Sequence, residues 1–261
     1  ELKSDDLDAL CQRGVLVRHG NGRLSLGHDI YEEWALVRIM DECYEDSGND
    51  FPTSLDGTLP TRRAYRLWIY DSIGNGRVDD AFVRRMLDSV GGIWREETVL
   101  ALLQWVHFGD FLMRNQDWLL ANGAALLMSL LSVVQIVGKV RRTKLGDLGL
   151  DINQASPLSY LYTEPAGKGW NDLICFLSRH IGAIESRSYG NIIEAIDFFC
   201  QTPKEGVAAQ AANHCALHLA RSCDQDGDGV PSRFYKRVAS VISTTVKAIS
   251  PSSIRTVLPT G

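Results

Sequence analysis

The sequence has no strong excess of charge of one sign, since 27 basic and 32 acidic residues among 261 give a formal net charge of −5. This balance excludes a strongly basic nucleic-acid-binding protein. Hydrophobic residues make up 45% and charged residues 23% of the chain, which excludes collagen, coiled coil and intrinsic disorder. The composition is that of a globular protein with one large domain or two small ones.

Signature motifs of enzymes are also missing. The chain contains neither the Gly-x-x-x-x-Gly-Lys-Ser/Thr loop that holds nucleotide phosphates, nor the Gly-x-Ser-x-Gly elbow, nor His-Glu-x-x-His. No pair of carboxylates stands out as a general acid and base. We therefore expect no catalytic residues in this chain.

Cysteine is scattered and never forms a Cys-x-x-Cys pair, although the chain has six: Cys11, Cys43, Cys175, Cys200, Cys215 and Cys223. This pattern indicates reduced, buried thiols of a cytoplasmic protein. His214 and His218 lie beside two of the cysteines and would share a helix face, so a zinc site there is the alternative. The chain begins with Glu1 in a charged stretch rather than with a signal peptide, and we interpret it as a piece of a longer protein.

Charge and helix patterns divide the chain. Residues 1–58 carry 13 acidic and 5 basic residues, whereas residues 59–261 carry 19 and 22. We expect residues 1–50 to form one domain and residues 51–261 another, with residues 47–60 as a linker rich in Ser, Gly, Asp and Pro.

The sequence pattern of residues 1–50 predicts a helix, a hairpin and a second helix. Residues 4–13 are amphipathic, residues 15–26 hold two short apolar runs around a Gly-Asn-Gly turn, and residues 28–46 have helical periodicity. We expect apolar side chains of the second helix to face inward: Ile30, Trp34, Val37, Ile39 and Met40. This order is that of the distal part of a winged helix.

The sequence pattern of residues 51–261 predicts a mainly α fold, an array of helix pairs similar in size to HEAT or armadillo repeats. Helical periodicity recurs at 61–73, 79–90, 95–108, 112–140, 169–183, 189–201, 204–222 and 232–249. Residues 118–138 carry no charge. We expect them to form a fully buried central helix, and a membrane span is the alternative.

His28 and Asp29 stand where the hairpin becomes a helix. Asp29 suits the first turn of the helix, whose free amides favour an anion. An imidazole at this corner can donate a hydrogen bond to a phosphate of a neighbouring domain. The alternative is that His28 only caps or packs the corner.

The segment Gly27-His28-Asp29 within residues 14–39 resembles the winged-helix segment of signal-transducing NTPases with numerous domains, the STAND class that includes NACHT and plant resistance proteins. There a wing hairpin runs into a helix that begins with Met-His-Asp, so Gly27 departs from the pattern. The resemblance implies nucleotide sensing by His28 on the β-phosphate of ADP, with Asp29 supporting the turn.

The resemblance also implies partners. An upstream nucleotide-binding domain would hold ADP or ATP, and the whole protein would hydrolyse ATP. The helical array would sense a protein ligand in defence signalling and trigger ligand-induced oligomerisation. The alternative hypothesis is a helical interaction scaffold that binds no nucleotide, and a third hypothesis is a membrane-associated protein.

Residue chemistry bears on two further binding modes, to duplex DNA and to calcium. Duplex DNA would face Asp5, Asp6 and Asp8 on the first helix, and these carboxylates repel phosphates, so we expect no nucleic-acid partner. A calcium-loop pattern places Asp224, Asp226 and Asp228 at its first, third and fifth positions. Position twelve is Tyr235 instead of the usual glutamate, so we expect weak calcium binding or a plain turn.

Overall fold

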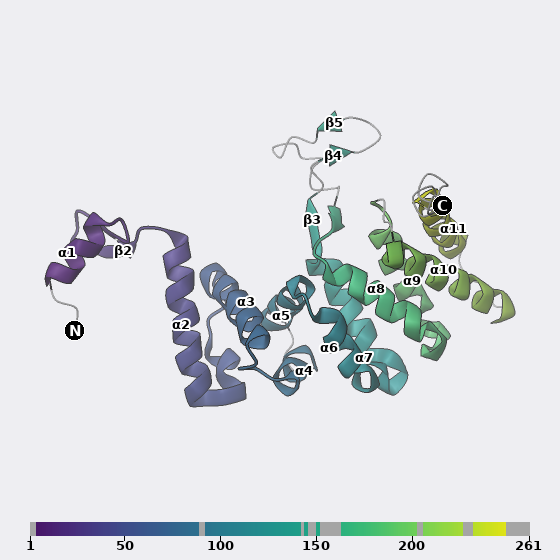
Figure 1. Ribbon diagram of the computed structural model, residues 1–261, viewed down its shortest axis with the longest axis horizontal. Helices are drawn as coiled ribbons and strands as arrows, with labels where there is room; N and C mark the ends of the chain where they lie inside the picture. The colour runs from purple at the N-terminus through teal and green to yellow at the C-terminus, as the bar shows by residue number, and fades with distance from the viewer. Residues whose placement is uncertain are drawn as a thin grey trace, which may run out of the picture. The chain divides into compact units, whose positions relative to one another are not determined.

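The computed structural model describes residues 4–88, 92–141, 144–145, 150–151, 163–202, 206–226 and 232–248. These residues are mainly helical with small antiparallel strand pairs, which confirms the mainly α part of the expected fold. The chain forms two compact units, Glu1–Ala101 and Leu102–Gly261 (Figure 1). Residues 51–101 therefore share a compact unit with residues 1–50.

The first unit begins with the expected helix, hairpin and helix. Helix α1 spans Ser4–Gln12, strand β1 Leu16–Arg18, strand β2 Leu24–Leu26 and helix α2 Asp29–Ser47. The strands pair antiparallel, with Leu16 opposite Leu26. Gly14 takes a left-handed conformation (φ 71°) that ends α1 and turns the chain into the hairpin.

The core of the first unit is an aromatic cluster. It lies among α2, the 3-10 helix η1 (Gly48–Ser54), α3 (Leu59–Gly74), α4 (Asp80–Asp88) and α5 (Ile93–Gln104). Phe51 is fully buried, and its ring centroid lies 4.7 Å from that of Trp68. Edge-to-face contacts of Tyr44 with Trp68 and Phe82 extend the cluster. The stretch interpreted as a linker thus contributes a core side chain.

Only the second half of α2 packs into this core. Met40 is buried, and Tyr44 contacts the aromatic cluster. Ile30, Trp34 and Ile39 were expected to face inward, and this prediction is wrong: their side chains are 40%, 59% and 50% exposed. Helix α3 packs on α2 and leaves these three side chains largely exposed.

A buried ion cluster ties α3 to α5. Glu97 is fully buried and accepts hydrogen bonds from Arg62 Nε (2.8 Å) and Arg66 Nε (2.7 Å). Both guanidinium groups also lie in ion-pair contact with the same carboxylate. Next to them, the Tyr65 and Thr98 hydroxyls share a hydrogen bond of 2.9 Å. A buried carboxylate held by two cations is compensated in charge, which keeps it tolerable in the interior.

The second unit arranges its helices in two layers. Its helices are α6 (Phe108–Arg114), α7 (Gln116–Val137), α8 (Gly169–His180), α9 (Tyr189–Phe199), α10 (Gly206–Asp226) and α11 (Ser232–Ala248). Helix α8 contacts both α6 and α10, whereas α9 contacts both α7 and α11 (Figure 1). Between α7 and α8, β3 (Lys139–Arg141) pairs with β6 (Thr163–Pro165), and β4 (Lys144–Leu145) with β5 (Leu150–Asp151).

Helix α7 is long and apolar enough to cross a membrane by composition, and it is broken in the middle. Asn122, Gly123 and Ala124 all have positive φ (52°, 68° and 64°), so two helical segments meet at this point. The longer segment, residues 125–137, spans about 20 Å at the helical rise, against about 30 Å of bilayer hydrocarbon. Full burial was expected, but only 33% of the apolar window is buried.

Candidate functional site

His28 is the N-cap of α2 in an extended conformation (φ −151°, ψ 140°). Its Nδ1 accepts a hydrogen bond from the backbone N–H of Ile30 at 3.1 Å. Because Nδ1 uses its lone pair as acceptor, the neutral imidazole carries its proton on Nε2. The ring is exposed, so this Nε2–H is free to donate away from the helix. The cap and a phosphate contact are therefore compatible rather than alternative roles.

Asp29 begins α2, and its side chain is exposed. Asp29 and Glu32 place two carboxylates in the first turn, which opposes the attraction of the helix N-terminus for an anion. A phosphate at this corner would meet one donor, the His28 Nε2–H, and two carboxylates, so its charge would have to be compensated from outside these residues.

Close packing of the backbone explains why residue 27 is glycine. A Cβ atom at this position would lie 2.0 Å from the carbonyl oxygen of Gly14. The Gly27 N–H also donates to the carbonyl of Val15 at 2.8 Å. The end of α1 and the end of β2 approach so closely that only glycine fits between them.

Exposed apolar side chains flank His28 in the chain. Four of them, from β2 and the first half of α2, we call the hairpin face: Leu24, Leu26, Ile30 and Trp34. Val17 is exposed too, but it lies on the other side of the hairpin because it pairs with Ser25. The Tyr31 ring meets His28 and Trp34 edge-on, with centroids 6.4 and 6.1 Å apart. Exposed apolar side chains gathered in this way mark a contact surface for another molecule or domain.

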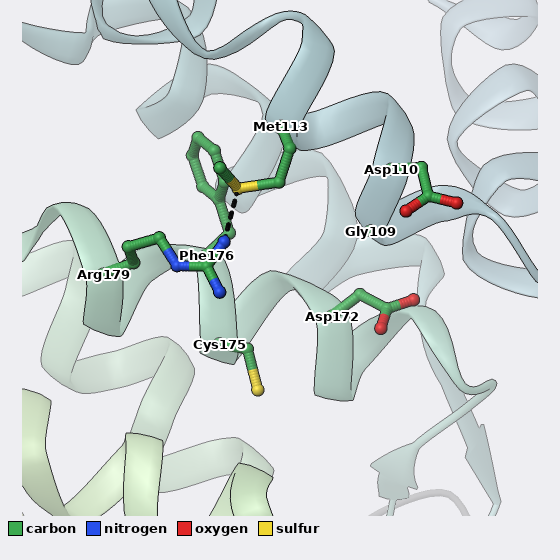
Figure 2. A pocket seen from close by; sticks show the side chains of 7 residues that line it. All are labelled: Gly109, Asp110, Met113, Asp172, Cys175, Phe176 and Arg179. Carbon is green, nitrogen blue, oxygen red and sulfur yellow. Dashed lines mark hydrogen bonds between the residues drawn. The ribbon is translucent and has the colours of Figure 1, made fainter.

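A second candidate site lies in the layer formed by α6, α8 and α10. A cavity of about 220 Å³ opens between α6 and α8, and Figure 2 shows the side chains that line it. A second cavity of about 370 Å³ opens between α8 and α10. Cys175 and Arg179 line both cavities, and we call the two neighbouring cavities together the α8 groove.

The acidic end of the α8 groove is formed by Asp110 and Asp172. Burial raises the pKa of Asp172, the Gly109 N–H that donates to its carboxylate opposes this, and the charge of Asp110 adds to the rise. His107 Nδ1 lies 3.1 Å from the Asp110 carboxylate. Within the described part of the chain, no cation pairs with Asp172. This end of the groove therefore carries a carboxylate that a ligand cation would stabilise.

The other end of the α8 groove carries Arg179. Its Nη1 donates to the sulfur of Met113 at 2.9 Å (Figure 2). A thioether is a weak acceptor, and among the described residues Arg179 has no ion pair with a carboxylate. Burial and the neighbouring Asp172 raise the pKa of the Cys175 thiol between the two ends. The thiol is therefore mostly protonated at neutral pH, and its small thiolate fraction reacts slowly with electrophiles.

Ser178 and His214 are joined across the groove wall. Ser178 Oγ lies 2.9 Å from His214 Nδ1. A nucleophilic serine needs a base that a third group orients, and in the described ranges no hydrogen bond holds the other ring nitrogen of His214. We interpret this pair as a link between α8 and α10. Cys215, beside it, is fully buried, and burial raises the pKa of its thiol to about 12.

The metal predictions stay predictions. Asp224 and Asp226 belong to the last turn of α10, and Asp228 lies outside the described residues. Across the described part of the chain, no group of three or more His, Cys, Asp or Glu side chains is placed to hold a metal ion.

The sequence analysis singled out His28, whose role stays a prediction, and missed the α8 groove and the ion cluster of Glu97. Spacing in the sequence could have indicated both sites: Arg62 and Arg66 are four residues apart, and Asp172, Cys175 and Arg179 share one helix face at spacings of three and four.

A scan against models of known protein families matches none, and a search of the curated proteins finds no relative.

Proposed function

We propose that this chain is the regulatory and sensor segment of a STAND-like signalling ATPase. The hairpin face packs against an upstream nucleotide-binding domain, and His28 donates its Nε2–H to the β-phosphate of ADP held there. The observation that carries this proposal is an exposed His28 with an outward Nε2–H donor, fixed by the cap to Ile30 and flanked in the chain by exposed apolar side chains of β2 and α2. Asp29 supports the turn that presents the imidazole.

The helices that follow act as the sensor in this proposal. We take them as a helical-repeat array of HEAT or armadillo scale, because α6, α8 and α10 form one layer and α7, α9 and α11 the other. A protein ligand binds the array and shifts the population from a closed, ADP-bound state to an open, oligomerising one. The protein acts in the cytoplasm, in defence signalling, and ATP hydrolysis belongs to the upstream domain.

A helical interaction scaffold, modulated weakly by calcium, is the second candidate. The α8 groove favours it, since a groove of this size binds a partner without any nucleotide. The two candidates differ in what His28 does: in the scaffold it is only a helix cap.

Nucleotide binding by the full-length protein separates the candidates. His28→Asn keeps a side-chain acceptor for the Ile30 N–H and removes the outward donor, so the cap survives while the phosphate contact is lost. His19→Ala is the matched control, because His19 is an exposed histidine of the same hairpin. We expect calorimetry to show ADP binding about tenfold weaker for His28→Asn and unchanged for His19→Ala. Equal ADP affinity of all three proteins, or none in any, contradicts the proposal.

A further inference from the structure

The α8 groove has opposite charges at its two ends and a neutral floor between them. Asp110 and Asp172 form one end, and Arg179 forms the other (Figure 2). Met113 and Cys175 line the space between the ends without charge. A ligand that satisfies both ends must therefore carry a cation and an anion separated by an apolar stretch.

The distance between the ends sets the size of that ligand. Asp172 and Arg179 are seven residues apart on α8, which is about 10 Å along the helix axis. A free amino acid is too short to reach both ends. An extended peptide advances about 3.3 Å per residue, so side chains two to four residues apart cover the span when they are as long as lysine or glutamate.

We propose that the α8 groove binds an extended peptide segment of a partner protein, with a lysine or arginine on Asp110 and Asp172 and an aspartate or glutamate on Arg179. The two charged residues lie two or four positions apart, so that both point into the groove. The apolar stem of the basic residue lies along Met113. This inference rests on the proposed role of the helical array as the ligand sensor and names the chemistry of its ligand.

Accessibility of Cys175 reports occupation of the groove, because this thiol lines both cavities and is half-buried. The probes are short acetylated and amidated peptides with one lysine and one glutamate, two or four positions apart and in either order, with a control series in which both are glutamine. Alkylation by iodoacetamide at mildly alkaline pH is followed by mass spectrometry. Cys11 and Cys43, also half-buried, are internal controls in the other unit, and the buried Cys200 and Cys215 stay unmodified while the chain is folded.

We expect charged peptides to slow the alkylation of Cys175 in a saturable way at millimolar concentration and to leave Cys11 unaffected. Asp172→Asn and Arg179→Gln each raise the half-saturating concentration about tenfold, measured against the peptide-free rate of the same variant. The exposed residues Asp117 and Arg221 provide matched controls, and their Asn and Gln variants behave as the unaltered chain.

Charge reversal is the most selective part of this test. Arg179→Glu turns the groove acidic at both ends, so it weakens binding of lysine–glutamate peptides and creates binding of peptides with two lysines. Equal protection by the glutamine peptides, or no protection of Cys175 by any peptide, overturns the proposal. The assay contains no nucleotide, so its failure is independent of the His28 experiment.

Discussion

Removal of the buried carboxylate of Glu97 should strongly destabilise the first unit. Glu97 is fully buried and its two partners, Arg62 and Arg66, are each 31% exposed at the side chain. Glu97→Ala leaves both guanidinium groups without a counter-ion, and loss of one member of a buried ion cluster costs about 3–5 kcal/mol. Because the arginines keep partial contact with water, we expect about 3 kcal/mol, which increases the opened population roughly a hundredfold.

Hydrogen exchange followed by mass spectrometry measures the free energy of opening of α3 and α5 separately from that of the second unit. Glu96→Ala, next in the chain and only half-buried, is the control and should change the free energy of opening by less than about 0.5 kcal/mol. Replacement of the whole cluster by Arg62→Met, Arg66→Met and Glu97→Leu should recover most of the stability. A loss below about 1 kcal/mol for Glu97→Ala, or an equal loss for Glu96→Ala, refutes the reasoning.

Three further substitutions test other parts of the account. In a urea titration, Gly27→Ala should lower the free energy of unfolding of the first unit by about 2 kcal/mol, since its Cβ meets a carbonyl oxygen at 2.0 Å. Gly20→Ala, which has open space around it, should leave this free energy unchanged. Trp34→Ser should change stability by less than about 0.5 kcal/mol while Met40→Ala costs about 3 kcal/mol; an equal loss would mean that the hairpin face is covered. Burial raises the pKa of Asp172, so ionisation of this carboxyl opposes folding. Asp172→Asn should therefore stabilise the chain at neutral pH, and the gain should vanish as the pH falls below the ordinary aspartate pKa. Thermal unfolding at both pH values measures this difference.

Local patterns predicted the elements of the chain well. The Gly-Asn-Gly turn predicted the hairpin, and helical periodicity predicted α2 and most later helices. The periodicity of α2 did not predict which apolar residues are buried. Met40 and Trp34 both belong to it, yet only Met40 is buried, because burial depends on which other elements pack against each part of the helix.

Long-range contacts were beyond sequence reasoning. Phe51 lies in a stretch whose composition is that of a linker, and its burial depends on Trp68 from a later helix. Similarly, Asp110 and Arg179 line the same cavity only because α6 packs on α8. His28 was found because its position at a strand-to-helix junction is local, and the hydrogen bond to Ile30 that fixes its tautomer needed coordinates.

The central claim is that His28 presents a donor to a nucleotide rather than serving only as a cap. The most direct measurement is the ADP content of the purified full-length protein and of its His28→Asn variant, together with their melting temperatures. The account predicts that the variant loses bound ADP, and that after removal of nucleotide both proteins melt at the same temperature because asparagine preserves the cap. Undiminished ADP in the variant, or an unaltered protein that carries and binds none, would contradict it.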